Sequence, residues 1–187
     1  IERETVYQVS QNAVRRMKAL LRSDMLRELE MQDTAIRVIL ELIPVSIKKE
    51  NGRYVEASRI DITEKTERGQ LTFRDGDVFK IRVKNLGASS AFFQIIDIKP
   101  NNEIDLLVPS GRETAAEYKI AGNTTRELPN LFIFEEHPGN EMFKLIATRE
   151  PLDLNSIITT RGGGKSGNFS LLEQIMQDAF IQTRTGP

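Results

Sequence analysis

The chain has 187 residues, and its 26 lysines and arginines nearly balance its 27 aspartates and glutamates. A net charge so close to zero creates no overall field that favours nucleic acid or an acidic membrane surface, so we expect no nucleic-acid partner. The sequence contains no cysteine and one histidine, His137. A cysteine nucleophile, a disulfide, an iron–sulfur cluster and a multi-histidine metal site are therefore excluded within this chain.

The apolar stretches are too short to cross a membrane as a helix, which needs about 18 to 20 uninterrupted apolar residues. The richest of them, residues 36–47, is interrupted by Arg37, Glu41 and Pro44. We therefore predict no membrane span. The chain also starts at Ile1 without a basic and then apolar leader, so we expect it to be a piece of a longer protein.

The first expected element along the chain is an amphipathic helix over residues 10–30. Apolar residues recur there at spacings of three and four, which places them on one helical face. The residues of this stripe are Val14, Met17, Leu20, Leu21, Met25 and Leu29. The opposite face carries basic residues, which we interpret as a solvated surface. A helix docked on a neighbouring domain is the alternative.

At residues 35–47 the period changes to two, which predicts a strand. Pro44 interrupts the alternation and the apolar residues then follow the opposite parity, so we expect a bend or a bulge there. Residues 48–68 are charged and weakly patterned, and Asn51-Gly52 is typical of a tight turn. The prediction for this stretch is a short hairpin followed by a loop.

The middle of the chain has the clearest β pattern. Lys80, Arg82 and Lys84 alternate with apolar residues in the segment 79–84, so we expect one buried face and one wet, basic face. Residues 91–98 are apolar on both faces, which is typical of a central strand. Further strands are predicted at residues 104–108, 117–120, 124–128, 131–135 and 141–148.

Short strands separated by turn signals favour a mainly β fold, and we predict an antiparallel β-sandwich of immunoglobulin-like or jelly-roll-like type. An N-terminal and a C-terminal amphipathic helix are expected to flank it. The predicted segments are an N-terminal helical linker over 1–33, the β-sandwich domain over 34–154, a glycine-rich linker over 155–169, and a C-terminal helix over 170–187 that packs on the domain or on a partner.

Two groups of oxygen-bearing side chains are weak candidates for holding a hard cation such as calcium. Asp75 and Asp77 lie across one turn, and Asn101, Glu103 and Asp105 offer a second set of ligands. Neither group forms a complete site with the roughly six to eight oxygens that calcium takes. We therefore interpret the Asp-Gly-Asp run as a turn that is closed by its own side chains, and we predict no metal and no cofactor.

Three other patterns that suggest chemistry lack the required context. The glycine-rich run that ends in Lys165-Ser166 misses the glycine that a phosphate loop requires, because Thr160 stands at that position. His137 lies in a polar loop and no serine-hydrolase motif accompanies it, so a hydrolase that uses His137 is the weakest functional hypothesis. The basic strand face has no interleaved aromatic side chains that would stack on nucleic-acid bases.

Four segments of the chain share a turn-then-strand character and occur in a distinctive order: FRDGDVFKIRVKN at 73–85, AFFQIIDIKPNNEI at 91–104, EYKIAG at 117–122 and GNEMFKLIAT at 139–148. In this order they resemble an uncharacterised bacterial β-rich domain family that is often found C-terminal to a caspase-like (metacaspase-type) peptidase domain. The resemblance covers about residues 70–154. The flanking residues 35–47 and 157–162 are also similar to the C-terminal half of such peptidase-linked proteins.

What the resemblance implies is a partner domain without catalytic residues. Caspase-like peptidases work through a cysteine and a histidine, and no catalytic residue can be carried over to a chain that has no cysteine. We therefore expect a non-catalytic C-terminal interaction or regulatory domain. Its expected partner is a caspase-like peptidase domain in the same parent chain, or another protein. The alternative is a β-sandwich module that binds calcium or a carbohydrate through its loop carboxylates.

Overall fold

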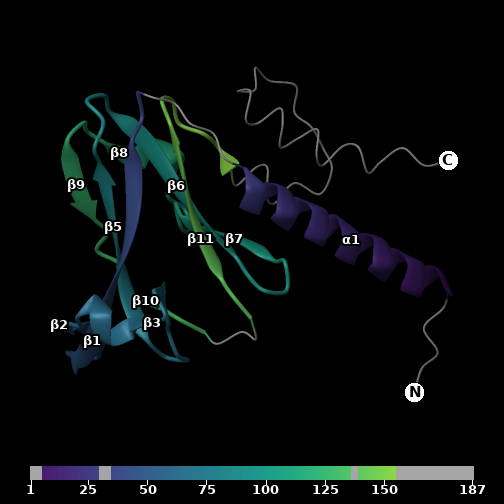
Figure 1. Ribbon diagram of the computed structural model, residues 1–187, viewed down its shortest axis with the longest axis horizontal. Helices are drawn as coiled ribbons and strands as arrows, with labels where there is room; N and C mark the ends of the chain where they lie inside the picture. Colours follow the sequence, from purple (N-terminus) through teal and green to yellow (C-terminus); the bar gives the residue numbers. More distant parts are fainter. Residues whose placement is uncertain (1–5, 30–34, 136–138, 155–187) are drawn as a thin grey trace. The chain divides into compact units, whose positions relative to one another are not determined.

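The computed structural model describes residues 6–29, 35–135 and 139–154 (Figure 1). These residues form one α-helix, eleven strands in antiparallel sheets and two short 3-10 helices. The chain therefore has the mainly β, antiparallel fold that the alternating sequence patterns predict. No helix among the described residues is long and apolar enough to span a membrane.

The described residues divide into two compact units that interleave along the chain. The first unit comprises Phe92–Tyr118 together with the described residues of Ile1–Gln32 and Gly139–Pro187. The second unit comprises Asp33–Ala91 and the described residues of Lys119–Pro138. Each unit has its own sheet.

The first unit contains a long helix and a small antiparallel sheet. The helix α1 spans Val6–Glu28. The sheet has the strand order β11-β6-β7, with β6 at Ala91–Ile98, β7 at Ile104–Val108 and β11 at Met142–Thr148. Because β6 is the central strand it is covered on both faces, and all but one of its residues are buried, as its uninterrupted apolar pattern predicts.

The core of the first unit lies where the last turns of α1 meet this sheet. Leu26 of α1 and Ile96, Ile98 and Ile146 of the sheet are buried in one cluster. Its other buried members are Leu152 and Leu154, and the partly buried Met25, Leu29, Ile104 and Leu106 pack against it. Only the C-terminal part of the helix stripe is therefore packed, and the earlier turns of α1 extend away from the sheet (Figure 1).

Polar contacts fasten the same end of α1 to the sheet. Lys144 of β11 donates its Nζ to the carbonyl oxygens of Leu26 and Arg27, at 2.6 and 3.0 Å. A helix leaves its last carbonyl groups without partners, so a cation placed there both satisfies them and suits the helix dipole. Arg27 reaches the turn between β6 and β7, where its Nη1 lies 2.8 Å from Asn102 Oδ1 and its Nη2 lies 3.1 Å from the Lys99 carbonyl oxygen.

The second unit is a five-stranded antiparallel sheet. Its path runs β10-β5-β1-β2, and β9 also pairs with β5. The strands are β1 at Val38–Glu50, β2 at Arg53–Arg59, β5 at Val78–Asn85, β9 at Thr124–Glu127 and β10 at Phe132–Ile133. The predicted hairpin at Asn51-Gly52 is confirmed, because β1 and β2 pair in antiparallel register and both turn residues have positive φ.

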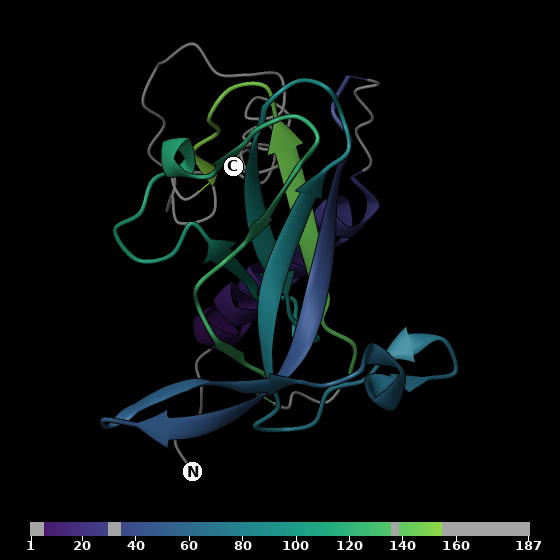
Figure 2. The same cartoon turned by 90° about the vertical axis from the view of Figure 1, so that its left-hand side faces the viewer.

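Strand β1 has the predicted length but lies three residues further along the chain than the predicted segment 35–47, and it continues through Pro44. Its first part pairs with β5 as far as Val45, and its last part pairs with β2 instead. The register with β2 shifts between Ser46 and Ile47, which marks a bulge. Figure 2 shows the result: β1 runs beside β5 and then turns outward as a hairpin with β2. The bend predicted near Pro44 is therefore present, displaced by two residues.

The remaining elements of the chain are short. The 3-10 helix η1 spans Ile62–Lys65 and is followed by the two-residue strands β3 at Thr66–Glu67 and β4 at Gln70–Leu71, which pair with each other. The second 3-10 helix, η2, spans Ala115–Glu117, and β8 spans Lys119–Ile120. Of the strand predicted at 117–120, the second half is β8, and Glu117 belongs to η2 instead.

A buried asparagine holds two loops of the second unit together. Asn85 at the end of β5 donates its Nδ2 to the Ser89 carbonyl oxygen at 2.8 Å, and its Oδ1 accepts a hydrogen bond from the Gly87 amide at 3.0 Å. The Asn123 amide donates to the Gly87 carbonyl oxygen at 2.9 Å, which closes the neighbouring turn onto this loop. These contacts explain why a polar side chain is buried here.

Several sequence predictions fall outside the described residues. The glycine-rich linker over 155–169, the C-terminal helix over 170–187 and His137 all lie there. The immunoglobulin-like or jelly-roll-like sandwich also stays a prediction.

Candidate functional site

A cavity in the first unit is the strongest candidate for a binding site. Its volume is about 570 Å³, within the size range of ligand pockets. It is lined by residues of β6, β7, the loop that follows β7 and the segment after β11. The lining residues are Gln94, Leu106, Pro109, Gly111, Arg112, Glu113, Thr114, Ala115, Ala116, Pro151, Leu152 and Asp153. We call it the Gln94 cavity.

A bulge in the sheet lies directly beside this cavity. Ile95 pairs with Val108 and Ile96 pairs with Leu106, so Leu107 has no opposite residue on β6. A bulge bends its strand and redirects the chain that follows. The loop after β7 therefore leaves the sheet and forms one wall of the cavity next to Gln94.

Two glutamates hold that loop in shape. Glu113 accepts hydrogen bonds from the Ser110 amide and hydroxyl, both at 3.1 Å, and from the Tyr118 hydroxyl at 2.5 Å. Glu117 accepts from the amide and hydroxyl of Thr114, at 3.2 and 3.1 Å. The Tyr118 ring in turn packs edge-on against Phe93 of β6. The wall is thus fixed by side chains that are themselves anchored in the sheet.

Gln94 is the one buried polar residue among the described residues that line the cavity. It is 3% exposed. Its Nε2 donates to the Leu152 carbonyl oxygen, which fixes the orientation of the amide group. Its Oε1 is buried and has no hydrogen-bond partner within the described part of the chain. A buried polar atom without a partner costs about 1 to 3 kcal/mol, so an atom of this kind beside a cavity indicates a missing partner.

The charges at the mouth of the cavity are of both signs. Arg112 is exposed and makes no ion pair or hydrogen bond within the described residues. Glu113 is held by Ser110 and Tyr118 as described above. Asp153 is the third charged residue of the lining. The described part of the lining therefore carries one cation against two carboxylates.

Residues 72–151 match the model of a family described as a domain of unknown function, DUF4384. The DUF4384 region contains the whole lining of the Gln94 cavity except Leu152 and Asp153. The helix α1 lies outside it. The match agrees with the expectation of an uncharacterised domain family. No curated protein and no solved structure matched the chain.

A second surface feature is the apolar stripe on the exposed turns of α1. Val9, Val14, Met17, Leu20 and Leu21 are between 45% and 63% exposed. Large apolar side chains exposed in a row on one element mark a surface that a partner covers. Val14, Met17, Leu20 and Leu21 belong to the stripe that the helical spacing predicts, and Val9 was not part of that prediction. The structure packs only the C-terminal end of the predicted stripe, Met25 and Leu29, next to Leu26.

The first group of predicted cation ligands lies in the second unit and makes other contacts. Asp77 accepts hydrogen bonds from Lys65 Nζ at 2.6 Å and from the Arg74 amide at 2.8 Å. Partial burial opposes ionisation of this carboxyl, but these two bonds hold the pKa of Asp77 below its ordinary value. The turn at Asp75-Gly76-Asp77 is therefore closed by its own side chain, as the sequence interpretation expects.

The second group of predicted ligands lies in the first unit. Asn101 accepts from the Glu103 amide and donates to the Glu103 carboxylate, both at 2.9 Å. Asp105 pairs with Lys99 at 2.8 Å, and this hydrogen bond raises the pKa of Lys99. No cluster of three or more acidic or histidine side chains with the geometry of a metal site occurs among the described residues. The two groups belong to different units, and cation binding by either of them stays an untested alternative.

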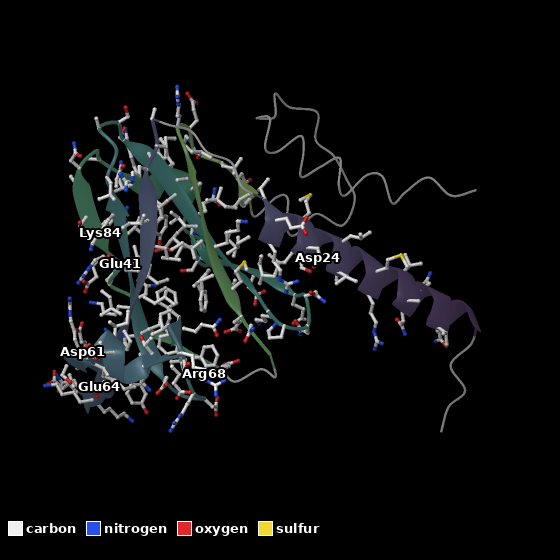
Figure 3. The ribbon with its side chains drawn as sticks, viewed as in Figure 1. Asp24, Glu41, Asp61, Glu64, Arg68 and Lys84 are labelled. Carbon is white, nitrogen blue, oxygen red and sulfur yellow. The ribbon has the colours of Figure 1, made fainter. Side chains whose placement is uncertain are left out.

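The basic face predicted on β5 is neutralised by glutamates. Lys80 lies 2.8 Å from Glu127 and 3.0 Å from Glu56, and Arg82 lies 3.0 Å from Glu127. Lys84 pairs with Glu41 of the adjacent strand β1 at 2.5 Å, as Figure 3 shows. The alternation along one strand therefore identified the cations but not the acidic residues that the neighbouring strands place beside them.

Glu127 is the centre of this network. It accepts hydrogen bonds from Lys80, Arg82 and Arg59, at 2.8, 3.0 and 2.8 Å. The hydrogen bond from Lys80 has the largest influence on this carboxyl. Partial burial opposes ionisation, but the hydrogen bonds from Lys80 and Arg82 together outweigh it and lower the pKa of Glu127 to about 2. The carboxylate thus stays ionised far below the pH at which an ordinary glutamate is protonated.

Replacing Glu127 with glutamine is expected to lower the free energy of unfolding by about 1 to 2 kcal/mol at neutral pH, because three cations lose their shared acceptor. The depressed pKa of Glu127 in the folded state stabilises the fold above pH 4.5, and this stabilisation is lost as the pH falls toward about 2. Urea unfolding of both proteins between pH 7 and pH 2 measures the difference. A difference that stays constant down to pH 2 would contradict the network.

Sequence reasoning missed Gln94 as a site residue. The sequence predicts a buried central strand over 91–98, and within it Gln94 is a polar residue at an inward position. A polar residue at a buried position is the signal that the sequence offered, because a buried amide must find hydrogen-bond partners. The rest of the cavity comes from a loop after β7 and from the segment after β11, and no local pattern shows that these two meet.

Proposed function

We propose that this chain is a non-catalytic interaction and regulatory module, and that its partner is a caspase-like cysteine peptidase domain in the same parent chain. The observation that carries the interaction role is the exposed apolar stripe of α1, formed by Val9, Val14, Met17, Leu20 and Leu21. The choice of partner rests on the resemblance of residues 70–154 to domains that follow such peptidases. The match to a domain family of unknown function is compatible with it.

The structure of α1 favours a docking role over a purely structural one. Its last turns already supply Leu26 to the core and are fastened by Lys144. The preceding turns repeat the same apolar spacing without packing on the described residues, although each exposed leucine or methionine would gain free energy from burial. A helix that is anchored at one end and carries an apolar face along its other turns can place that face in a groove of a second protein.

Charged substitutions on this stripe test the proposal in the intact parent protein. The double variant Met17→Glu and Leu21→Glu is expected to weaken docking at least about tenfold, because docking would bury two charges without partners. Peptidase activity of the parent, or its dependence on activators, is expected to change with the loss of docking. Peptide hydrolysis rates and substrate choice measure this effect.

The matched control is Arg16→Glu. Arg16 is also exposed on α1, and its replacement changes the net charge by the same two units as the double variant. Activity is expected to stay at the level of the unmodified parent in the control. The proposal fails if the parent's gene product contains no caspase-like domain, or if the double variant leaves activity, substrate choice and binding partners unchanged.

A further inference from the structure

We propose that the Gln94 cavity binds a peptide segment, with one backbone N–H of the peptide donated to Gln94 Oε1 and an aliphatic side chain held between the walls. The proposal rests on the cavity alone and is independent of the peptidase assignment above. It assigns a ligand class to a site that lies almost entirely within the matched family region.

The buried amide of Gln94 defines the first requirement of the ligand. Its Nε2 is engaged by the Leu152 carbonyl oxygen, so the amide cannot turn over without losing that bond. Its Oε1 can only accept, and the described residues supply it with no donor. The ligand must therefore bring an N–H or O–H group to a position next to β6.

The walls define the second requirement. Leu106, Pro109, Ala115, Pro151 and Leu152 line the cavity with aliphatic surface, and none of the lining residues that the structure describes is aromatic. A sugar ring is usually held by stacking on an aromatic face, which this lining does not offer. An aliphatic side chain such as that of leucine suits these walls, because it buries apolar area on both sides.

The charges define the third requirement. Among the described lining residues Arg112 is the single cation, and Glu113 and Asp153 are acidic. A phosphate or nucleotide needs several donors or cations around its oxygens, and two carboxylates at the mouth would repel it. An uncharged backbone amide meets no such penalty.

A peptide unit satisfies all three requirements together. It carries an N–H donor and an aliphatic side chain a few ångströms apart, and it has no net charge. The volume of about 570 Å³ is sufficient for a segment of this kind. Extended peptides are recognised by hydrogen bonds to their main chain together with pockets for their side chains, and this cavity offers one of each.

The test uses blocked amino acids as probes of the full 187-residue chain. N-acetyl-leucinamide carries both the N–H donors and the side chain. Its fully N-methylated analogue keeps the side chain without donors, and N-acetyl-glycinamide keeps the donors without the side chain. We expect N-acetyl-leucinamide to bind with a dissociation constant on the order of millimolar, as suits a ligand of this size. The two other probes are expected to bind at least about tenfold more weakly.

Nuclear magnetic resonance of the isotope-labelled chain reports where the probe binds. The expected shifts are confined to the side-chain NH₂ signal of Gln94, the backbone amides of residues 111–116 and those of residues 152–153. Two variants remove the site in different ways: Gln94→Met deletes the acceptor, and Ala115→Phe fills the cavity. Each is expected to weaken binding at least about tenfold. Gln70→Met, at an exposed position of β4, is the matched control and is expected to bind as the unmodified chain does.

The possible outcomes decide the proposal. Probe shifts at the cavity that both cavity variants lose and the control keeps would support it. If Gln94→Met does not fold, Ala115→Phe alone decides. The proposal is overturned if N-acetyl-leucinamide shifts no cavity signal, if the N-methylated analogue binds equally well, or if Ala115→Phe binds the probe as tightly as the unmodified chain.

Discussion

Replacing Leu26 with alanine is expected to lower the free energy of unfolding by about 3 to 4 kcal/mol. Leu26 is 1% exposed and lies in the cluster that joins α1 to the sheet of the first unit. Its removal leaves a void between Ile96, Ile98 and Leu154, and the anchored end of the helix limits how far the neighbours can collapse into it. Thermal and urea unfolding of the whole chain measure the loss.

Leu21→Ala is the matched control for this prediction. It removes the same atoms from the same helix, but Leu21 is 56% exposed. The expected change in unfolding free energy is within about 0.5 kcal/mol of zero. If the two variants had equal effects, α1 would not be anchored at its C-terminal end. Leu21→Ala has a second use, since the proposed docking role predicts weaker partner binding from a variant that keeps its stability.

Replacing Gly122 with alanine is expected to cost about 3 kcal/mol or more of unfolding free energy. A Cβ atom at this position would lie 2.0 Å from the carbonyl oxygen of Ala88 and 2.4 Å from its carbonyl carbon. Both are backbone atoms, so the loop after β5 must move as a whole. That movement pulls against the hydrogen bonds that Asn85 makes with Gly87 and Ser89.

Gly111→Ala separates this steric effect from the general cost of replacing a glycine. Gly111 has a φ of 62° and nothing within 4 Å of a new Cβ atom. Its replacement is expected to cost about 1 kcal/mol through backbone strain alone. Unfolding experiments on the two variants compare these costs directly. A loss below about 1 kcal/mol for Gly122→Ala would show that the loop is not held where the structure places it.

The parts of the fold that the sequence predicted are those with a strong local period. The central strand β6 and the Asn51-Gly52 hairpin were found, because alternation and turn residues act over a few neighbours. The helix α1 begins earlier than predicted, at Val6, since no proline or glycine stops it there. The bend near Pro44 was expected, but its position between Ser46 and Ile47 and the continuation of β1 to Glu50 were not, because they depend on pairing with β5 and β2 in turn.

The candidate sites were harder to predict, because they depend on which strands are neighbours. Lys80 and Arg82 were identified as exposed cations, but their pairing with Glu127 follows from the antiparallel register of β5 and β9. The Gln94 cavity likewise needs the bulge opposite β6 and the return of the chain at Leu152. Neither contact leaves a periodic signal in the sequence.

The two units interleave along the chain, and this limits where the ends of a stable fragment can be placed. The matched family segment, residues 72–151, contains β5 but not β1, which is hydrogen-bonded to β5 over eight residue pairs. It also contains β6 but not Leu26, which covers β6 in the core. Cutting the chain at the limits of sequence similarity would therefore expose a strand edge in one unit and an apolar sheet face in the other. In this protein the segment that matches the family model is smaller than the part of the chain that covers both sheets, and a fragment that keeps that cover includes α1 and β1.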